Sequence, residues 1–404
     1  MKKVFTVLIL IMAMILLVAC IDKDNNDNLQ NENSEEVEEE KRDKIKTVLD
    51  TMTLNEKIGQ LLIVGFDGTT VDENITDLIE NKHIGGVVFF GSNVESVSSV
   101  ISLTNNFKSI NSKNKVPLFI SVDEEGGVVS RTPDEFKKLP SASYVGSFYS
   151  EEICYKEGTI IADELKLMGY NIDYAPVLDI LSNPENTVIG KRAFGTTAYI
   201  VSKLGIKVMK GLQDNEVISV IKHFPGHGDT LVDSHYGLPL VKKSLDELKA
   251  LEFIPFEESI ENGADAIMVS HILLERIDSE NPASMSKIVI SDILRGDMGF
   301  NGVIISDDMT MGAIVDNYDI KDAAIKSINA GVDLLLVCHE YDKEIEVINA
   351  IEGAVINGSI SEERINESVY RILQIKDKYN LSNEPVSETY NVDSINNAIE
   401  NLFN

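Results

Sequence analysis

The strongest constraint on the fold is a regular alternation of short apolar runs with longer helix-like stretches over residues 45–380. The runs are rich in branched aliphatic residues and end at glycine or polar residues, as expected for buried strands. We expect eight strands, at Leu61–Val64, Gly86–Phe90, Leu118–Val122, Ile172–Leu178, Val217–Ile221, Ala266–Val269, Val303–Ile305 and Leu334–Val337.

The stretches between the runs are typical of helices. Apolar positions recur every three or four residues in Cys154–Met168 and Ser244–Asn262, and Gly169 and Gly263 follow as expected C-terminal caps. Eight strand–helix units predict the α/β class and a single TIM-type (β/α)8 barrel at residues 45–380. A doubly wound open sheet is the alternative, but no Gly-x-Gly-x-x-Gly follows the first run.

The N-terminal segment is typical of export. Residues 1–20 combine two lysines, an apolar stretch and small residues before Cys20, and the end of this segment resembles the lipobox of bacterial lipoproteins. The alternative is a transmembrane anchor, for which the apolar stretch is slightly short. We therefore expect a lipoprotein signal peptide at 1–20, lipidation of Cys20, and a protein anchored to the outer side of the cell membrane.

The flanks of the expected barrel are polar. Residues 22–44 hold ten acidic and four basic residues and almost no apolar ones, so we expect residues 21–44 to form a disordered acidic linker. Residues 381–404 are expected to be a C-terminal tail or terminal helix. The formal net charge of -30 argues against nucleic-acid binding, which requires basic surfaces, and favours an uncharged or cationic substrate. The three cysteines have no metal-like spacing.

Polar residues follow the predicted strands, at the end of the barrel where active sites of this architecture lie. They occur at Asp123–Gly127, Asp179, Lys222–His223, Ser270–His271 and Ser306–Asp308. Asp307 would project from a buried strand near the barrel axis, as a nucleophile or as a stabiliser of a cationic transition state. We expect Asp308, one residue later, to point elsewhere and to cap or hydrogen-bond a loop.

The segment from Lys222 to His235 holds three of the six histidines of the chain. Asp233 lies two residues before His235 and could orient its ring, so that the pair acts as a general acid and then a general base. With Asp307 as nucleophile, this set satisfies the minimum for retaining glycoside hydrolysis. A zinc site is the alternative, although no typical metal-binding spacing is present. We expect His227 to hydrogen-bond within a turn.

Further side chains in these loops could bind a sugar. Lys222, Arg131 and Arg192 could donate hydrogen bonds to hydroxyl or acetamido groups, and Asp123 could accept two hydroxyl protons. Each alone is weak evidence, since isolated basic residues are usually solvated surface. Their position after predicted strands favours a role in binding.

These motifs resemble glycoside hydrolase family 3, and in particular its β-N-acetylglucosaminidase branch. The resemblance covers residues 48–380 and is carried by the following runs: Lys222-His223-Phe224-Pro225-Gly226-His227-Gly228, Asp233-Ser234-His235, Met52–Gln60, Val122–Gly127, Ala175–Asp179, Gly190–Gly195, Pro282–Ser286 and Ser306–Met309. It implies that Asp307 is the nucleophile, His235 the acid/base and Asp233 its partner. It also implies sugar contacts from Asp123, Arg131, Arg192, Lys222 and His223.

The resemblance implies a substrate and a setting as well. Family members of this branch release terminal N-acetylglucosamine from muropeptides during cell-wall turnover and need no metal or other cofactor, and we expect a monomer. Val128 departs from the pattern, because the branch commonly has arginine there, and this puts one contact near the sugar in doubt. We also expect no second domain after the barrel. The alternatives are a β-glucosidase, an N-acetylglucosaminide phosphorylase, or an inert wall-binding lipoprotein.

Overall fold

The computed structural model describes residues 40–230, 233–234 and 237–403. The expected signal peptide with Cys20 therefore lies outside the described residues, as does most of the expected linker. A helix covers residues 40–51, so the last five residues of the expected linker are helical. It belongs to a first unit, Met1–Thr51, and the barrel belongs to a second unit, Met52–Asn404. No helix of the described residues is long and apolar enough to cross a membrane.

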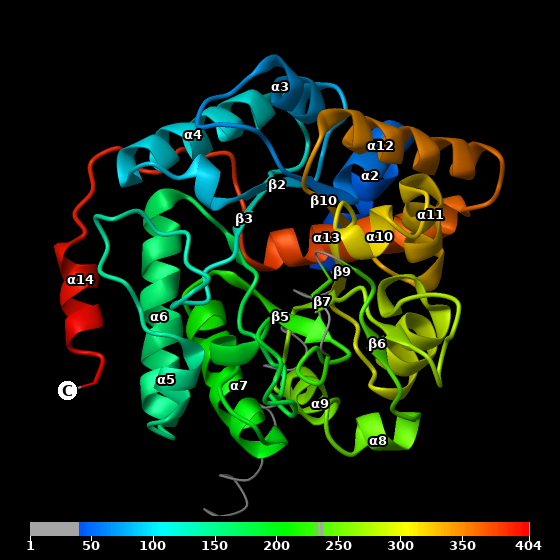
Figure 1. Ribbon diagram of the computed structural model, residues 1–404. Helices are drawn as coiled ribbons and strands as arrows, with labels where there is room; N and C mark the ends of the chain where they lie inside the picture. Colours follow the sequence, from blue (N-terminus) through cyan, green and yellow to red (C-terminus); the bar gives the residue numbers. More distant parts are fainter. Residues whose placement is uncertain (1–39, 231–232, 235–236, 404) are drawn as a thin grey trace, which may run out of the picture. The chain divides into compact units, whose positions relative to one another are not determined.

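The second unit is built around a closed parallel barrel, which confirms the predicted fold (Figure 1). The order of the strands around the barrel is β1-β10-β9-β7-β5-β4-β3-β2, and β2 pairs with β1 to close it. The strands are β1 (Leu62–Val64), β2 (Gly86–Phe89), β3 (Phe119–Val122), β4 (Ile172–Asp173), β5 (Ile218–Phe224), β7 (Ala266–Val269), β9 (Val303–Asp308) and β10 (Leu334–Val337). All eight predicted strands are present. Because helices cover a parallel barrel on its outer side, its strands are buried throughout, which explains their continuous apolar runs.

Helices surround the barrel and connect its strands (Figure 1). They are α2 (Leu54–Gln60), α3 (Glu73–Glu80), α4 (Val97–Ile110), α5 (Ala142–Gly146), α6 (Glu151–Met168), α7 (Ala198–Asp214), α8 (Leu245–Lys249), α9 (Ile254–Glu261), α10 (Gly312–Val315), α11 (Ile320–Ala330), α12 (Tyr341–Ile356), α13 (Glu362–Lys378) and α14 (Asp393–Glu400). A π-helix at Ile288–Asp297 and short 3-10 turns, among them η3 (Gly190–Arg192), complete the set.

Two details differ from the predicted elements. The single helix expected at Ser244–Asn262 is two helices, α8 and α9, because the chain turns between Ala250 and Phe253 and restarts with Pro255 in the first turn of α9. A small two-stranded sheet of β6 (Leu240–Val241) and β8 (Leu273–Leu274) was not predicted. Two-residue strands are too short to produce a periodic pattern.

The C-terminal residues are ordered against the barrel unit. Helix α14 lies beside α6 (Figure 1), and Asn396 on α14 accepts a hydrogen bond from the Lys137 backbone and donates one to the Glu135 carbonyl. The expected tail therefore contains a terminal helix. At the N-terminal end of the barrel, the buried Lys376 ammonium of α13 donates hydrogen bonds to the Gln60 side chain and to two backbone carbonyls.

Candidate active site

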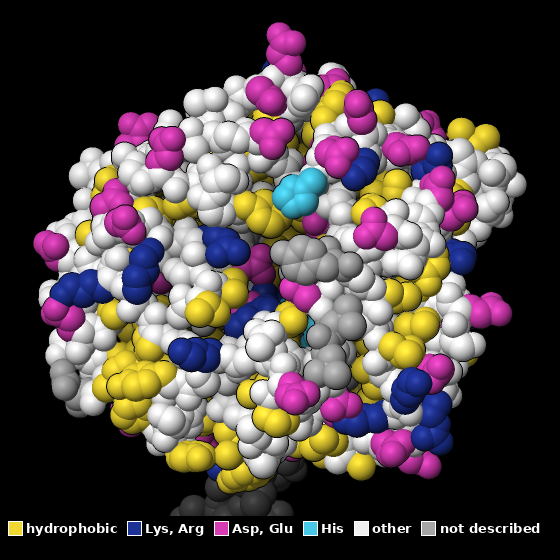
Figure 2. Space-filling model, viewed as in Figure 1, with side chains coloured by type: hydrophobic (Ala, Val, Ile, Leu, Met, Phe, Trp, Pro, Cys, Tyr) yellow, Lys and Arg dark blue, Asp and Glu magenta, His cyan; other side chains and the backbone are white. Residues whose placement is uncertain are grey.

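A cavity of about 210 Å³ opens at the C-terminal ends of the barrel strands. Figure 2 shows it as a hollow in the middle of this face, where acidic and basic side chains gather. Six of the eight residues expected to act in catalysis or sugar binding line it: Asp123, Arg131, Arg192, Lys222, His223 and Asp307. They lie at the ends of β5 and β9 and in the loops after β3 and β4, so the closure of the barrel brings together side chains that lie far apart in the sequence.

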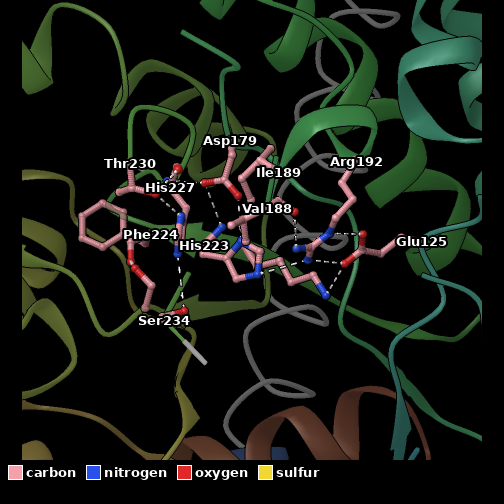
Figure 3. Close-up of polar contacts among 12 residues, drawn as sticks. Glu125, Asp179, Val188, Ile189, Arg192, His223, Phe224, His227, Thr230 and Ser234 are labelled. Carbon is pink, nitrogen blue, oxygen red and sulfur yellow. Dashed lines mark hydrogen bonds and ion pairs between the residues drawn. The ribbon is translucent and has the colours of Figure 1, made fainter. Parts of the chain in front are cut away.

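Lys222 lies at the centre of a charged array on one wall. Its ammonium contacts the carboxylates of Asp123 at 2.5 Å and Glu125 at 2.7 Å. Arg192 binds both oxygens of the Glu125 carboxylate, each at 2.7 Å (Figure 3). Such a bidentate pair fixes the plane of the guanidinium group. The array therefore presents one carboxylate, one ammonium and one guanidinium group in fixed positions.

The array holds its charges because its members are paired. Burial alone would raise the pKa of Glu125, but Lys222 and Arg192 lower it to about 2. Burial alone would lower the pKa of Lys222, but Asp123 and Glu125 raise it above its usual value. Glu125, Lys222 and Arg192 thus stay ionised across the neutral pH range. A rigid electrostatic surface for a polar ligand needs such fixed charges.

A second network fixes His223, near the end of β5, and His227, in the loop after it. The buried Asp179 carboxylate lies 2.7 Å from Nδ1 of His223 and accepts the backbone N–H of His227 at 2.6 Å (Figure 3). Burial alone would raise the pKa of Asp179, but its contacts with His223 and His227 lower it. Nε2 of His223 lies 3.4 Å from the Arg192 guanidinium. His223 is therefore held from both sides with its ring edge at the cavity.

The loop after β5 has the tight shape predicted from its glycines. Gly226 has a φ of 122°, and a Cβ on Gly228 would lie 1.7 Å from the Ile180 carbonyl oxygen. The His227 ring contacts the hydroxyls of Thr230 at 2.6 Å and Ser234 at 3.4 Å. His227 thus hydrogen-bonds within the turn as expected, although it also reaches the cavity.

The two aspartates at the end of β9 have different surroundings. Asp307 lines the cavity, as predicted from its place at the strand end. The Asp308 carboxylate accepts hydrogen bonds from the backbone N–H groups of Thr310 and Cys338 and from the Thr310 hydroxyl. Asp308 therefore stabilises its loop, as expected, and borders the cavity as well.

The proposed acid/base pair lies only partly within the described residues. His235 falls outside them, and Asp233 is half-buried. Between the two, the Ser234 carbonyl accepts the backbone N–H of Ala313 at 3.0 Å, in α10 directly after β9. This bond ties the loop that carries Asp233 to the loop after the Asp307 strand. The roles of Asp233 and His235 remain predictions.

Several site residues were not assigned from the sequence. Glu125 supports both Lys222 and Arg192, and a signal for it existed, because alternation places it on the same side of its segment as Asp123. Tyr174 and Met268 line the cavity from within predicted apolar strands, where their sequence pattern shows only burial. Val128 is 68% exposed and does not line the cavity, so the side chain at this position makes no contact there.

The described residues contain no candidate metal site. Among them, no group of three or more histidine, cysteine, aspartate or glutamate side chains is arranged to hold a metal ion. His223 and His227 are instead engaged with Asp179, Arg192 and Thr230.

Residues 53–375 match the family described as the glycosyl hydrolase family 3 N-terminal domain. The chain belongs to glycosyl hydrolase family 3. It is similar to β-hexosaminidase A of Pseudoalteromonas piscicida, with 33% identity over 77% of this chain and 56% of that protein, so it spans little more than half of this relative. It is also similar to a β-hexosaminidase of Nitrosomonas eutropha, with 33% identity over 78% of this chain and 91% of that one.

Solved structures agree with this assignment. A family 3 β-N-acetylglucosaminidase from Paenibacillus sp. str. FPU-7 is 37% identical and has a TM-score of 0.84, covering 87% of this chain and 68% of that one. The family 3 chain described here is thus a glycoside hydrolase.

Proposed function

We propose that this family 3 enzyme is a retaining exo-β-N-acetylglucosaminidase, which releases terminal β-linked N-acetylglucosamine through a covalent intermediate on Asp307. One observation carries the proposal: Asp307 lines the same enclosed cavity as the charged array of Asp123, Lys222 and Arg192. A carboxylate nucleophile and fixed hydroxyl-binding groups are thus within reach of a single sugar ring. The names of the similar β-hexosaminidases support the choice of sugar.

The proposed reaction has two steps. In the first, a carboxylate oxygen of Asp307 attacks the anomeric carbon, while His235, oriented by Asp233, protonates the departing glycosidic oxygen. In the second, His235 removes a proton from water, which attacks the anomeric carbon and releases Asp307 as a carboxylate. The bond between Ser234 and Ala313 supports this division of roles, because it ties the loop of the acid/base pair to that of the nucleophile.

The sugar would be held by the array and by its neighbours. Asp123 would accept hydroxyl protons, whereas Lys222 and Arg192 would donate hydrogen bonds, with the edge of His223 beside them and Arg131 at the rim. Since the two buried cations are held by Glu125, their positions need not change when the substrate binds. Preorganised donors of this kind lower the barrier without a cost for rearrangement.

The proposed setting is the outer side of the cell membrane. Residues 1–20 end in the lipobox-like run before Cys20, which supports a lipid anchor followed by an acidic linker. A monomeric enzyme on such a tether would meet cell-wall fragments, so we propose N-acetylglucosamine-terminated muropeptides as its substrate. Metabolic labelling with a fatty acid, compared between the native chain and Cys20→Ser, tests the anchor.

Trapping tests the nucleophile. Incubation with a 2-fluoro or otherwise slow N-acetylglucosaminide, followed by peptide mass mapping, should place a sugar adduct on Asp307, and Asp307→Ala should lose both the adduct and turnover. Fragmentation distinguishes Asp307 from Asp308, and an adduct on Asp308 would contradict the assignment. Comparing N-acetylglucosaminide with glucoside, each with and without phosphate, separates hydrolysis from the β-glucosidase and phosphorylase alternatives.

A further inference from the structure

A second, smaller cavity adjoins the active-site cavity. Cys338 and His339, which follow β10, line both. The second cavity holds about 30 Å³, which is room for about two waters or one ammonium group. It lies between the loop after β1, the start of α3 and the start of α12.

The wall of this second cavity is acidic. Asp67, Asp72 and Glu344 line it. The Glu344 side chain is only 2% exposed and, among the described residues, makes no hydrogen bond or ion pair. Burial first, and then the nearby Asp67, Asp308 and Asp72 carboxylates, raise the pKa of Glu344 to about 8. A buried carboxyl group in such surroundings lacks a positive partner.

Two basic side chains near this wall in the sequence have partners of their own. Lys343, beside Glu344 in sequence, pairs at 2.6 Å with Glu340, which also lines the second cavity. The His339 ring lies 3.8 Å from the Asp308 carboxylate. Figure 2 shows that acidic side chains predominate over α3 and α12 on this face. The second cavity therefore holds, in Glu344, a buried carboxyl group that no cation of the described residues compensates, and a bound cation would favour its ionised form.

The barrel order places this cavity opposite the sugar-binding wall. In the ring of eight strands, β1 lies between β10 and β2 and directly across from β5, which carries Lys222 and His223. At the border of the two cavities, the rings of Phe90 and His339 lie 5.0 Å apart, centre to centre, and both face the active-site cavity. When the sugar to be released is held on the β5 side, the leaving group on the other side of the scissile bond would extend along the Phe90 and His339 rings toward the second cavity.

We propose that the second cavity is a leaving-group subsite that binds a primary ammonium group on the aglycone. The Glu344 carboxyl group, which the bound ammonium would ionise, is its main partner, and the Phe90–His339 pair is the surface along which the aglycone lies. This inference rests on the proposed function and extends it to the leaving group. The ammonium group can belong to an unacetylated amino sugar or to a lysine-type side chain of a peptide. Both present the same charge and the same three donors.

Two matched substrate pairs test the subsite. The first is N-acetylglucosaminyl-β-1,4-glucosamine against its N-acetylated form, and the second is an N-acetylglucosaminyl-muramoyl peptide with a free or an acetylated lysine. In at least one pair, kcat/KM should favour the free amine by about tenfold, as a charge-assisted hydrogen bond predicts. The pair that shows the preference identifies the source of the amine.

Variants of two glutamates on α12 test whether the preference for the free amine depends on Glu344. Glu344→Gln should bring the ratio of the two kcat/KM values to about 1. Glu352→Gln removes the same charge from an exposed position of the same helix and should keep the ratio, which controls for the general attraction of a cation to an acidic protein.

The outcomes separate this inference from the proposed function. Release of N-acetylglucosamine without an amine preference in either pair overturns the subsite and leaves the proposed function intact. A preference that survives in Glu344→Gln, or that disappears equally in Glu352→Gln, also overturns the subsite. No release from any of the four substrates or from an aryl N-acetylglucosaminide overturns the proposed function, and the subsite with it.

Discussion

At the scale of single residues, the site depends on side chains that do not touch the substrate. Glu125 does not line the cavity, yet its carboxylate accepts hydrogen bonds from Arg192 and lies 2.7 Å from the Lys222 ammonium. Two buried cations lie beside each other here, and they would repel one another without a carboxylate between them. Glu125 is therefore a positioning residue, which acts through the two cations.

Replacing Glu125 by glutamine tests this role. Glu125→Gln removes the charge but not the shape, so Lys222 and Arg192 should lose their fixed geometry, and kcat/KM should fall by about 100-fold, mostly through KM. Steady-state kinetics on folded protein, checked by circular dichroism, measures the effect. Asp134→Asn, on an exposed position of the same segment, should keep kcat/KM within about twofold. An unchanged kcat/KM in Glu125→Gln would show that the array is structural only.

The sequence was most informative about residues whose type alone suggests chemistry. Asp123, Lys222 and Asp307 were assigned because polar groups follow apolar strands, His223 was assigned from the family resemblance, and all four line the cavity. The partners of Asp179 and Glu125 needed the fold, because they lie 44 and 67 residues away in the chain, although the positions of both carboxylates after predicted strands were visible in the sequence. His339 was not singled out from the sequence. It becomes a site residue because the closed barrel places β10 and β2 on either side of β1, so that His339 after β10 meets Phe90 after β2.

At the scale of elements, strands were more predictable than the contacts between helices. A buried parallel strand is a short apolar run with a polar end, and this signal is local. The distance between two helices is set instead by small residues on facing surfaces, which a single sequence does not pair. Helices α6 and α7 show this, because Gly158 of α6 lies against the Val208 carbonyl and Gly211 of α7.

The α6–α7 contact predicts a large effect of one methyl group. A Cβ on Gly158 would lie 2.3 Å from the Val208 carbonyl oxygen, and a backbone atom cannot yield cheaply. Gly158→Ala should therefore lower the free energy of unfolding by about 2–3 kcal/mol. Gly353→Ala in α12, where nothing lies within 4 Å of the new methyl group, should instead raise it by about 0.5–1 kcal/mol. Urea denaturation measures both, and equal effects of the two substitutions would contradict the close packing.

At the scale of the whole molecule, the acidic composition continues into the interior. Both side-chain oxygens of Glu157 and Glu164 on α6 are buried without a hydrogen-bond partner among the described residues, as is one oxygen of Asp173 on β4. Burial, followed by the charge of Glu124, raises the pKa of Glu157 to about 8, and burial raises that of Glu124 to about 7 despite hydrogen bonds from three backbone N–H groups. At mildly acidic pH the folded protein therefore holds neutral carboxyl groups beside the ionised array of its active site.

These buried acids make stability depend on pH in the opposite direction to the active-site carboxylates. For Glu157, the folded state binds its proton up to a pH of about 8, whereas the unfolded chain releases it near the ordinary pKa of 4.5. The stabilisation is thus complete below pH 4.5 and is lost as the pH rises to 8. For Glu125, with a pKa of about 2, stabilisation is complete above pH 4.5 and is lost as the pH falls toward 2. The two effects together favour a stability maximum in mildly acidic solution.

Substitution of Glu157 should make the free energy of unfolding depend less on pH above pH 5. Between pH 5 and pH 8 the ionisation of Glu157 should lower the free energy of unfolding of the native chain by on the order of 3 kcal/mol, and Glu157→Gln should remove that share because glutamine does not titrate. Urea denaturation at the two pH values gives the difference for each protein. Glu152→Gln, on an exposed position of the same helix, should retain the native pH dependence. The same loss of stability in Glu157→Gln as in the native chain would mean that Glu157 is already ionised in the folded barrel.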